Sequence, residues 1–269
     1  MSPIATAGFR PDFDSVALFS DFDGTLVDLA PTPESILVPQ GLGRLLGLLA
    51  SSLEGAFAII TGRPIADVAG FLAPARFAIA GAHGAERQHA DGRYEGPPAE
   101  IVAACEAIAA SLDALHAREP RILVEKKPGA VALHYRLAPE LETACRAAIA
   151  AAIHPFPEFS LIAGKMVFEA RPRGIGKGEA VRQFLAEPPF VGRWPLFIGD
   201  DTTDEDGFVA AQELGGLGIK VGAGESAARL RLPDTHSVRA LLVELAAGRN
   251  EEVKARLSAP QVFLWSDRL

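Results

Sequence analysis

The chain has 269 residues, of which 49% are hydrophobic and 22% are charged, and its formal net charge is −8 at pH 7. This length allows one large α/β domain, or a core with a smaller second domain. The acidic balance leaves no basic face for a polynucleotide, so we expect no nucleic-acid partner. Every apolar stretch is interrupted before the ~20 residues of a membrane span, so we expect no membrane partner.

The two cysteines, Cys105 and Cys145, are far apart in the sequence and form no CxxC pattern. No apolar segment of the secretory kind precedes them. We therefore expect a reduced protein of the cytoplasm, and we expect it to be a monomer.

Apolar runs alternate with amphipathic segments in the first part of the chain. Strands are predicted at 15–20, 56–60 and 76–80, and a leucine-rich helix at 41–53. Continuous apolar strands separated by helices are typical of a parallel sheet covered on both faces. Helices and strands alternate again near the C-terminus, at 178–185, 195–199, 204–214 and 218–222.

The order of predicted elements changes between Pro97 and Pro172. Here a helix is followed by two adjacent strands, and this order then repeats, at 99–117, 121–127, 130–136, 139–153, 158–163 and 165–171. Adjacent strands beside helices are typical of an α/β sandwich, so the segment is predicted to be an inserted domain. The alternative is a single continuous sheet. The predicted division is a core made of 1–97 and 173–269, with 98–172 as the insert.

Polar residues follow the ends of the predicted core strands, where ligands of open α/β sheets bind. Asp21 and Asp23 follow the first strand, and residues two apart in extended backbone project to the same side. Both carboxylates could therefore reach one ligand. Thr61 and Arg63 follow the second strand, and Lys177 stands where a glycine-bounded loop enters a helix.

A further group of carboxylates, including Asp200 and Asp204, follows the strand at 195–199. Carboxylates gathered without a cation raise one another's pKa values, so the pattern favours a divalent ion. Mg²⁺ prefers oxygen ligands and binds through one or two carboxylates plus substrate phosphate. Lys177 and Arg63 would add positive charge for the phosphate oxygens. Each of these residues, taken alone, is also explained as a helix cap, a turn residue or a surface lysine.

Four motifs resemble those of the haloacid dehalogenase superfamily of phosphohydrolases, in the same chain order: DFDGT (21–25), TGR (61–63), KG (177–178) and GDDTTDED (199–206). The resemblance implies a Rossmann-like parallel-sheet core with an inserted α/β cap. It also implies that Asp21 is the nucleophile, which forms an aspartyl-phosphate, and that Asp23 is the acid/base. An aspartate at position 23 favours a phosphatase or phosphomutase over the dehalogenase, phosphonatase and transport-ATPase branches.

The same resemblance implies the remaining roles in the core. Mg²⁺ would be bound by Asp21, the backbone carbonyl of Asp23 and Asp200, with Asp204 supporting the site from behind. Thr61 and Lys177 would hold the phosphoryl oxygens.

From Ala17 to about Val243 the chain resembles trehalose-6-phosphate phosphatases, notably in AGAHGAERQ (80–88), ALHYR (132–136) and GKMVFEARPRGIGKGEA (164–180). The resemblance implies that the insert recognises the sugar. The implied hydroxyl-binding residues are Glu125, Lys127 and Glu169, with Arg136 and Lys165 near them; Gly62, Arg63 and His83 complete the expected substrate-binding set. Cross-strand pairing on an exposed sheet is the alternative for Glu125, Lys127 and Arg136.

The leading hypothesis is a Mg²⁺-dependent phosphatase that hydrolyses trehalose 6-phosphate to trehalose and phosphate. A second hypothesis keeps this mechanism with another sugar phosphate, such as sucrose phosphate or mannosyl-phosphoglycerate, because the four core motifs do not contact the sugar. A third is a catalytically silent regulatory domain that binds sugar phosphate. The presence of Asp21, Asp23, Lys177 and Asp200 argues against the third. In each case the expected partner is a small-molecule sugar phosphate.

Overall fold

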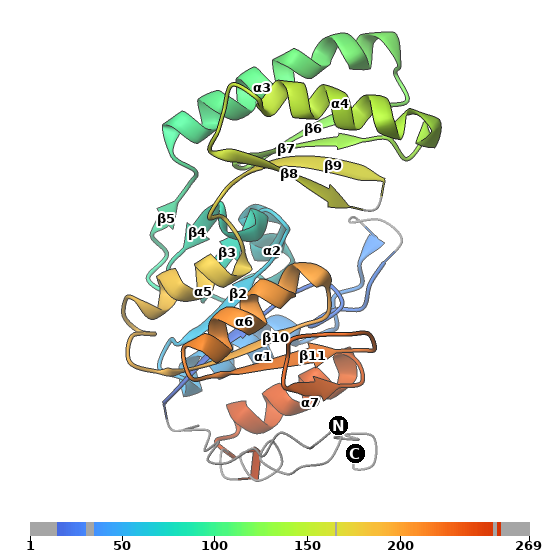
Figure 1. Cartoon of the computed structure of the whole chain (residues 1–269). Coiled ribbons are helices and arrows are strands. Elements are labelled where there is room, and N and C mark those ends of the chain that lie inside the picture. The colour runs from blue at the N-terminus through green and yellow to red at the C-terminus, as the bar shows by residue number, and fades with distance from the viewer. Residues whose placement is uncertain (1–14, 31–34, 165, 250–251, 254–269) are drawn as a thin grey trace, which may run out of the picture.

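The computed structural model describes residues 15–30, 35–164, 166–249 and 252–253, and two separate sheets organise them (Figure 1). The larger sheet contains β1 (Val16–Ser20), β2 (Phe57–Ile60), β3 (Ala78–Gly81), β4 (Glu86–Gln88), β5 (Tyr94–Glu95), β10 (Trp194–Gly199), β11 (Leu217–Val221) and β12 (Leu230–Leu232). Its order is β12-β11-β10-β1-β2-β3-β4-β5. The strands from β12 to β3 are parallel, and β4 and β5 form an antiparallel edge.

Helices cover both faces of the larger sheet, as the continuous apolar strands predict. One face packs against α1 (Leu42–Ser52), α2 (Ile65–Leu72) and α7 (Thr235–Ala246), and the other against α5 (Lys177–Leu185) and α6 (Glu205–Glu213). Strand β1 shows why both faces are apolar. Leu18 joins the first apolar cluster, whereas its neighbours Ala17 and Phe19 join the second, because successive side chains point to opposite faces.

The smaller sheet is antiparallel, and helices cover only one of its faces. It contains β6 (Leu123–Lys127), β7 (Ala130–His134), β8 (Phe159–Gly164) and β9 (Val167–Pro172), in the order β6-β7-β9-β8. The covering helices are α3 (Ala99–Arg118) and α4 (Glu142–Ile153), and the short 3-10 helix η4 (Pro139–Leu141) precedes α4. The open face is turned toward the larger sheet (Figure 1).

Alternation along the strands separates the two faces of the smaller sheet. In β9, Phe168 and Ala170 belong to the apolar cluster beneath the helices, so Glu169 and Arg171 project from the open face. The predicted strand at 121–127 begins two residues later in the structure, and the predicted strand at 130–136 ends two residues earlier. The predicted helix at 139–153 is divided into η4 and α4.

The carboxyl ends of β1, β2 and β10 meet at the edge of the larger sheet that faces the smaller one (Figure 1). The register pairs Ser20 with Ile198, and the backbone N–H of Asp21 donates to the carbonyl of Ile198 at 2.8 Å. This edge therefore carries the residues that follow all three strands. Among the helices of the described ranges, none combines the length and the hydropathy that crossing a membrane requires.

Candidate active site

A buried lysine joins two carboxylates at this edge. Lys177, the first residue of α5, donates from Nζ to Oδ1 of Asp21 and to Oδ1 of Asp204, each at 2.6 Å. At most 6% of any of the three side chains is exposed. Burying such ions costs several kcal/mol each and is sustained only by close partners. The cluster therefore holds α5, the end of β1 and the loop after β10 in one arrangement.

Asp204 also orders the loop that carries Asp200. It lies in the 3-10 helix η5 (Thr202–Asp204), and its Oδ2 accepts hydrogen bonds from the backbone N–H groups of Asp200 at 3.0 Å and Asp201 at 2.9 Å. Both oxygens of Asp204 are thus engaged, one by Lys177 and one by the loop. Asp204 therefore joins Lys177 to the loop that carries Asp200, and its role behind a bound metal stays a prediction.

Three carboxylates at this edge could hold one cation. Asp21, Asp200 and Asp204 can each offer one oxygen within 4.8 Å of the others. Gly24 makes room for the Asp200 carboxylate, because a Cβ at position 24 would lie 2.1 Å from Oδ2 of Asp200. The φ of Gly24 is +76°, which also favours glycine. An all-oxygen donor set suits a hard divalent ion such as Mg²⁺.

The charges of the cluster are not balanced by Lys177 alone. Burial raises the pKa of Asp21 to about 8, against the opposing effect of the Lys177 ammonium. Burial and the charge of Asp204 raise the pKa of Asp200 to about 6. Although burial lowers the pKa of Lys177, the charges of Asp21 and Asp204 raise it above its usual value, so the ammonium stays protonated. An added cation would favour the ionised carboxylates.

Asp23 lies outside this cluster and pairs with Arg63. Nε and Nη2 of Arg63 donate to the two carboxylate oxygens at 2.6 and 2.7 Å, and the guanidinium lies over the rings of Phe22 and Phe71. Asp23 is thus not joined to Lys177 or to the other carboxylates in this structure, and the expectation that both aspartates reach one ligand stays a prediction. The strand ends at Ser20, and the chain enters a turn in which extended alternation no longer applies.

Thr61 and Gly62 follow β2 and contact His83. Oγ1 of Thr61 accepts from the backbone N–H of Arg63 at 3.1 Å, and its carbonyl accepts from the N–H of His83 at 2.8 Å. His83 lies in the 3-10 helix η3 (Ala82–Gly84) with a φ of 58°. A Cβ on Gly62 would lie 2.7 Å from Cε1 of His83, so glycine permits this contact. Burial, followed by the charge of Lys177, lowers the pKa of His83 to about 3, which keeps the imidazole neutral.

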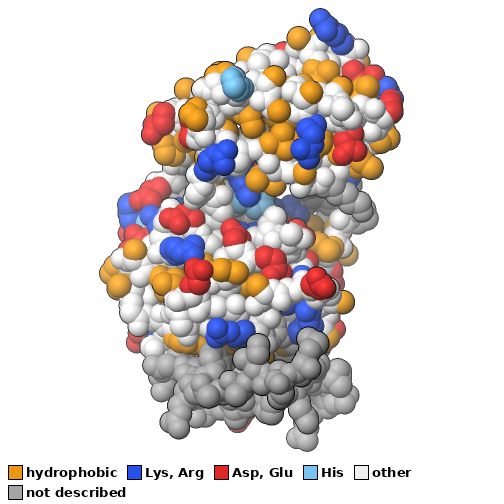
Figure 2. Space-filling view, in the orientation of Figure 1, with side chains coloured by type: hydrophobic (Ala, Val, Ile, Leu, Met, Phe, Trp, Pro, Cys, Tyr) orange, Lys and Arg blue, Asp and Glu red, His pale blue; other side chains and the backbone are white. Residues whose placement is uncertain are grey.

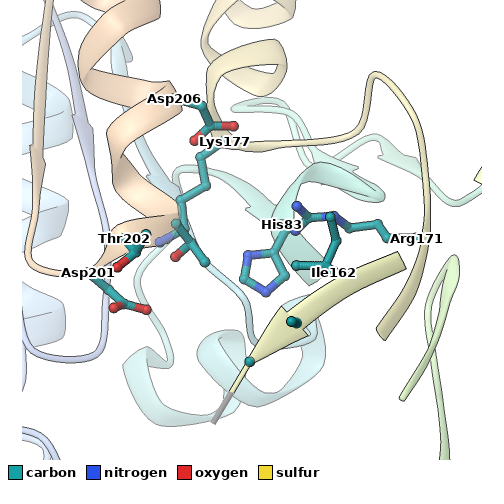
Figure 3. A pocket seen from close by; sticks show the side chains of 10 residues that line it. His83, Ile162, Arg171, Lys177, Asp201, Thr202 and Asp206 are labelled. Carbon is teal, nitrogen blue, oxygen red and sulfur yellow. The ribbon is translucent and has the colours of Figure 1, made fainter. Parts of the chain in front are cut away.

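A cavity of about 640 Å³ lies between the two sheets and reaches Lys177. Its lining comes from both sides: His83, Ile162, Ala163, Gly164, Arg171, Lys177, Asp201, Thr202, Thr203 and Asp206. Figure 3 shows Arg171 and Ile162 from the smaller sheet opposite Asp201 and Thr202, which follow β10 of the larger sheet. Figure 2 shows the surface hollowed between these two parts of the molecule. The volume is within the ~300–1,000 Å³ range of small-molecule sites.

The predicted sugar-binding residues form a charged group on the open face of the smaller sheet. Nζ of Lys127 lies 3.3 Å from Oε2 of Glu169 and 3.9 Å from Oε2 of Glu125. His134 extends the group, with Nε2 2.8 Å from Oε2 of Glu125. The cross-strand pairing considered for Glu125 and Lys127 is thus present, and it places these side chains on the face that is turned toward the larger sheet.

Two predicted substrate-binding residues are not joined to this group. Arg136 is exposed in the turn after β7, and no interaction within the described part of the chain connects it to Glu125, Lys127 or Glu169. Lys165 lies outside the described residues.

Sequence reasoning missed Lys220, a buried residue of β11 whose Nζ donates to the backbone carbonyl of Asp200. The available signal was a lysine inside the apolar strand pattern GIKVG (218–222). It also missed the cavity-lining residues Thr202, Thr203 and Asp206, which lie within the acidic motif but carried no separate signal.

The fold and the site together place buried Asp and Lys residues at the ends of parallel strands, beside a cavity that lies beneath a second sheet. A haloacid dehalogenase-like hydrolase from B. subtilis has the same fold, with a TM-score of 0.56 at 16% identity over 84% of this chain and 98% of that one. The trehalose-phosphatase family profile matches residues 19–236. The chain therefore belongs to the trehalose-phosphatase family.

Individual relatives agree with this assignment. A trehalose-6-phosphate phosphatase from Escherichia coli (strain K12) is 41% identical over 228 residues, which are 82% of this chain and 84% of that protein. The crystal structure of a trehalose-6-phosphate phosphatase related protein has a TM-score of 0.71 at 27% identity, covering 88% of this chain and 100% of that one.

Replacing Lys177 tests whether the buried cluster holds the fold together. Lys177→Met leaves two buried carboxylates without their shared partner, so the free energy of unfolding should fall by about 3–5 kcal/mol at neutral pH. Urea denaturation followed by circular dichroism measures the loss. Lys126→Met is the control, because Lys126 forms an exposed ion pair with Glu106 and its loss should change little. Equal small losses in both variants would contradict a structural role for the cluster.

Proposed function

We propose that this protein hydrolyses trehalose 6-phosphate to trehalose and phosphate through an aspartyl-phosphate. The observation that carries the proposal is Asp21, held by Lys177 at the edge of the cavity, in a chain of the trehalose-phosphatase family. Lys177 lines the cavity, so its ammonium would attract a phosphate ester toward the Asp21 carboxylate. A silent binding domain would need no such arrangement.

Asp21 would attack phosphorus with a carboxylate oxygen, while the bond from phosphorus to the sugar oxygen breaks. Asp23 would donate a proton to the leaving oxygen of trehalose. Water would then attack the aspartyl-phosphate, with Asp23 accepting its proton and Asp21 regenerated. Asp23 accepts two hydrogen bonds from Arg63 in this structure, so carrying a proton requires that at least one of them break. Lys177 and Thr61 would contact the phosphoryl oxygens.

The proposed cofactor is Mg²⁺, held by Asp21, Asp200 and the backbone carbonyl of Asp23, with Asp204 behind them. The all-oxygen cluster and its raised pKa values support a divalent cation. When bound, Mg²⁺ would neutralise charge on the phosphoryl group and on the carboxylates that surround it. Without that neutralisation the cluster would repel a phosphate dianion.

We propose that the insert, residues 98–172, is a cap over the core formed by 1–97 and 173–269. Its open face would contribute Glu125, Lys127 and Glu169 to the sugar hydroxyls, with Arg136 and Lys165 as further candidates from sequence. Gly62, Arg63 and His83 would contact the substrate from the core side. A movable cap serves phosphoryl transfer, because the reaction needs a dry centre and product release needs an open one.

We further propose a monomer that acts in the reducing cytoplasm. Cys105 and Cys145 are buried free thiols, and burial raises the pKa of Cys105 to about 11, so its reactive thiolate is scarce. A small-molecule substrate requires no partner chain.

Phosphate release from a panel of sugar phosphates tests the proposed activity. The wild-type protein should prefer trehalose 6-phosphate over sucrose 6-phosphate and mannosyl-phosphoglycerate by kcat/KM. Asp21→Asn should abolish turnover of every substrate without changing the circular dichroism spectrum, because an amide is a poor nucleophile. Preference for another sugar phosphate would redirect the substrate assignment, and activity in a folded Asp21→Asn variant would refute the nucleophile.

Replacing Lys126 and Lys127, which lie on opposite faces of β6, tests whether the proposed cap binds the sugar. Lys127→Ala should lower kcat/KM for trehalose 6-phosphate about 10- to 100-fold, because a hydrogen bond to a charged group is lost. It should barely affect p-nitrophenyl phosphate, which has no sugar. Lys126→Ala is the matched control, since Lys126 pairs with Glu106 of α3, away from the open face. Parallel losses on both substrates would mean that Lys127 supports the fold and not sugar recognition.

The affinity for Mg²⁺ should depend on pH, because protons compete with the metal for the same carboxylates. The pKa values are about 8 for Asp21 and about 6 for Asp200, so the protonated form of each carboxyl becomes more populated as pH falls. Affinity should therefore weaken by up to about tenfold per unit from about pH 8 to about pH 6, and more steeply below. Isothermal titration calorimetry in buffers of different ionisation enthalpy would detect the released proton. A flat profile with no proton release would contradict these pKa values.

A further inference from the structure

Lys220 is a charged residue in a strand that is otherwise buried. It lies in β11 between Ile219 and Val221, and only 6% of the residue is exposed. Its neighbours point into the apolar cluster of α1, α2 and α7, so Lys220 projects from the opposite face. A buried ammonium without partners is costly, so the fold must give this group a specific hydrogen-bonding role.

The partner of Lys220 is the backbone of a proposed metal ligand. The register places Lys220 opposite Gly199 on β10, and its Nζ donates to the carbonyl of Asp200. The N–H of Asp200 donates in turn to Oδ2 of Asp204 at 3.0 Å. The two backbone groups of Asp200 are thus held from opposite ends, its N–H by an anion and its carbonyl by a cation.

We propose that Lys220 is a positioning residue, which fixes the backbone of Asp200 so that its carboxylate stays within reach of Asp21 and Asp204. The proposal rests on the proposed metal site, and it concerns a residue that would touch neither substrate nor metal. Oγ1 of Thr25 donates to Oδ1 of the Asp200 carboxylate at 3.5 Å and restrains the side chain, whereas Lys220 restrains the main chain. Both restraints are needed to hold a ligand in one place.

The direction in which Mg²⁺ affinity changes when Lys220 is removed distinguishes a positioning role from a purely electrostatic one. The positive charge of Lys220 is close enough to Asp200 to lower its pKa, so it also repels a cation bound there. If charge were its only contribution, removing Lys220 would strengthen Mg²⁺ binding. If Lys220 positions Asp200, removing it weakens Mg²⁺ binding despite the lost repulsion.

The test compares Lys220→Met, which removes donor and charge, with Lys220→Arg, which keeps both. Mg²⁺ titrated into substrate-free protein by calorimetry should bind Lys220→Met with a Kd raised on the order of 10- to 100-fold, the usual cost of losing an outer partner of a metal ligand. Lys220→Arg should recover part of the affinity. Ile219→Val is the matched control, because it trims the same strand on the opposite face and should leave the Kd unchanged.

Amide hydrogen exchange in metal-free protein gives a second readout that does not depend on Mg²⁺. The peptide that contains residues 199–204 should exchange faster in Lys220→Met than in wild type or Ile219→Val, because the loop loses one of its anchors. An unchanged or tighter Kd together with unchanged exchange would overturn the proposal. A wild-type protein that binds no Mg²⁺ would refute the proposed metal site, and the exchange rates would still decide the role of Lys220.

Discussion

One ammonium group shared by two buried carboxylates connects the parts of this molecule that must act together. Lys177 follows β9 of the smaller sheet in the chain, Asp21 follows the first strand, and Asp204 belongs to the loop after β10. The bonds between Lys177 and its two partners therefore join three distant stretches of sequence. Lys177 supplies one positive charge to a cluster that also contains the Asp200 carboxylate, so the structure that the lysine stabilises could hold a further cation.

Much of the fold could be predicted because its signals are local. The core strands are continuous apolar runs, and residues such as Leu18 and Phe19 are buried on opposite faces of the same strand. The alternation in β9 likewise separates Phe168 from Glu169. The short edge strands β4 and β5 were not predicted, because ERQ and YE contain no apolar run and owe their pairing to β3.

The site was predictable in its chemistry but not in its pairings. Motif order indicates that Asp21, Lys177, Asp200 and Asp204 belong together, and the structure gathers them. The order of the motifs could not indicate that Arg63 pairs with Asp23, since this pairing depends on a turn that redirects the chain after Ser20. The left-handed backbone of His83 was equally hidden, because non-glycine residues adopt that conformation only rarely.

The smaller sheet keeps its packing residues and the residues that we propose for sugar binding on opposite faces. Phe168 and Ala170 pack under the helices, while Glu169 and Arg171 project from the same strand toward the cavity side. Replacements on the open face therefore leave the packing of the helices intact. The sugar specificity that we propose for this face could therefore be changed, by a lineage or a designer, through a few substitutions at alternate positions, without repacking the helices beneath.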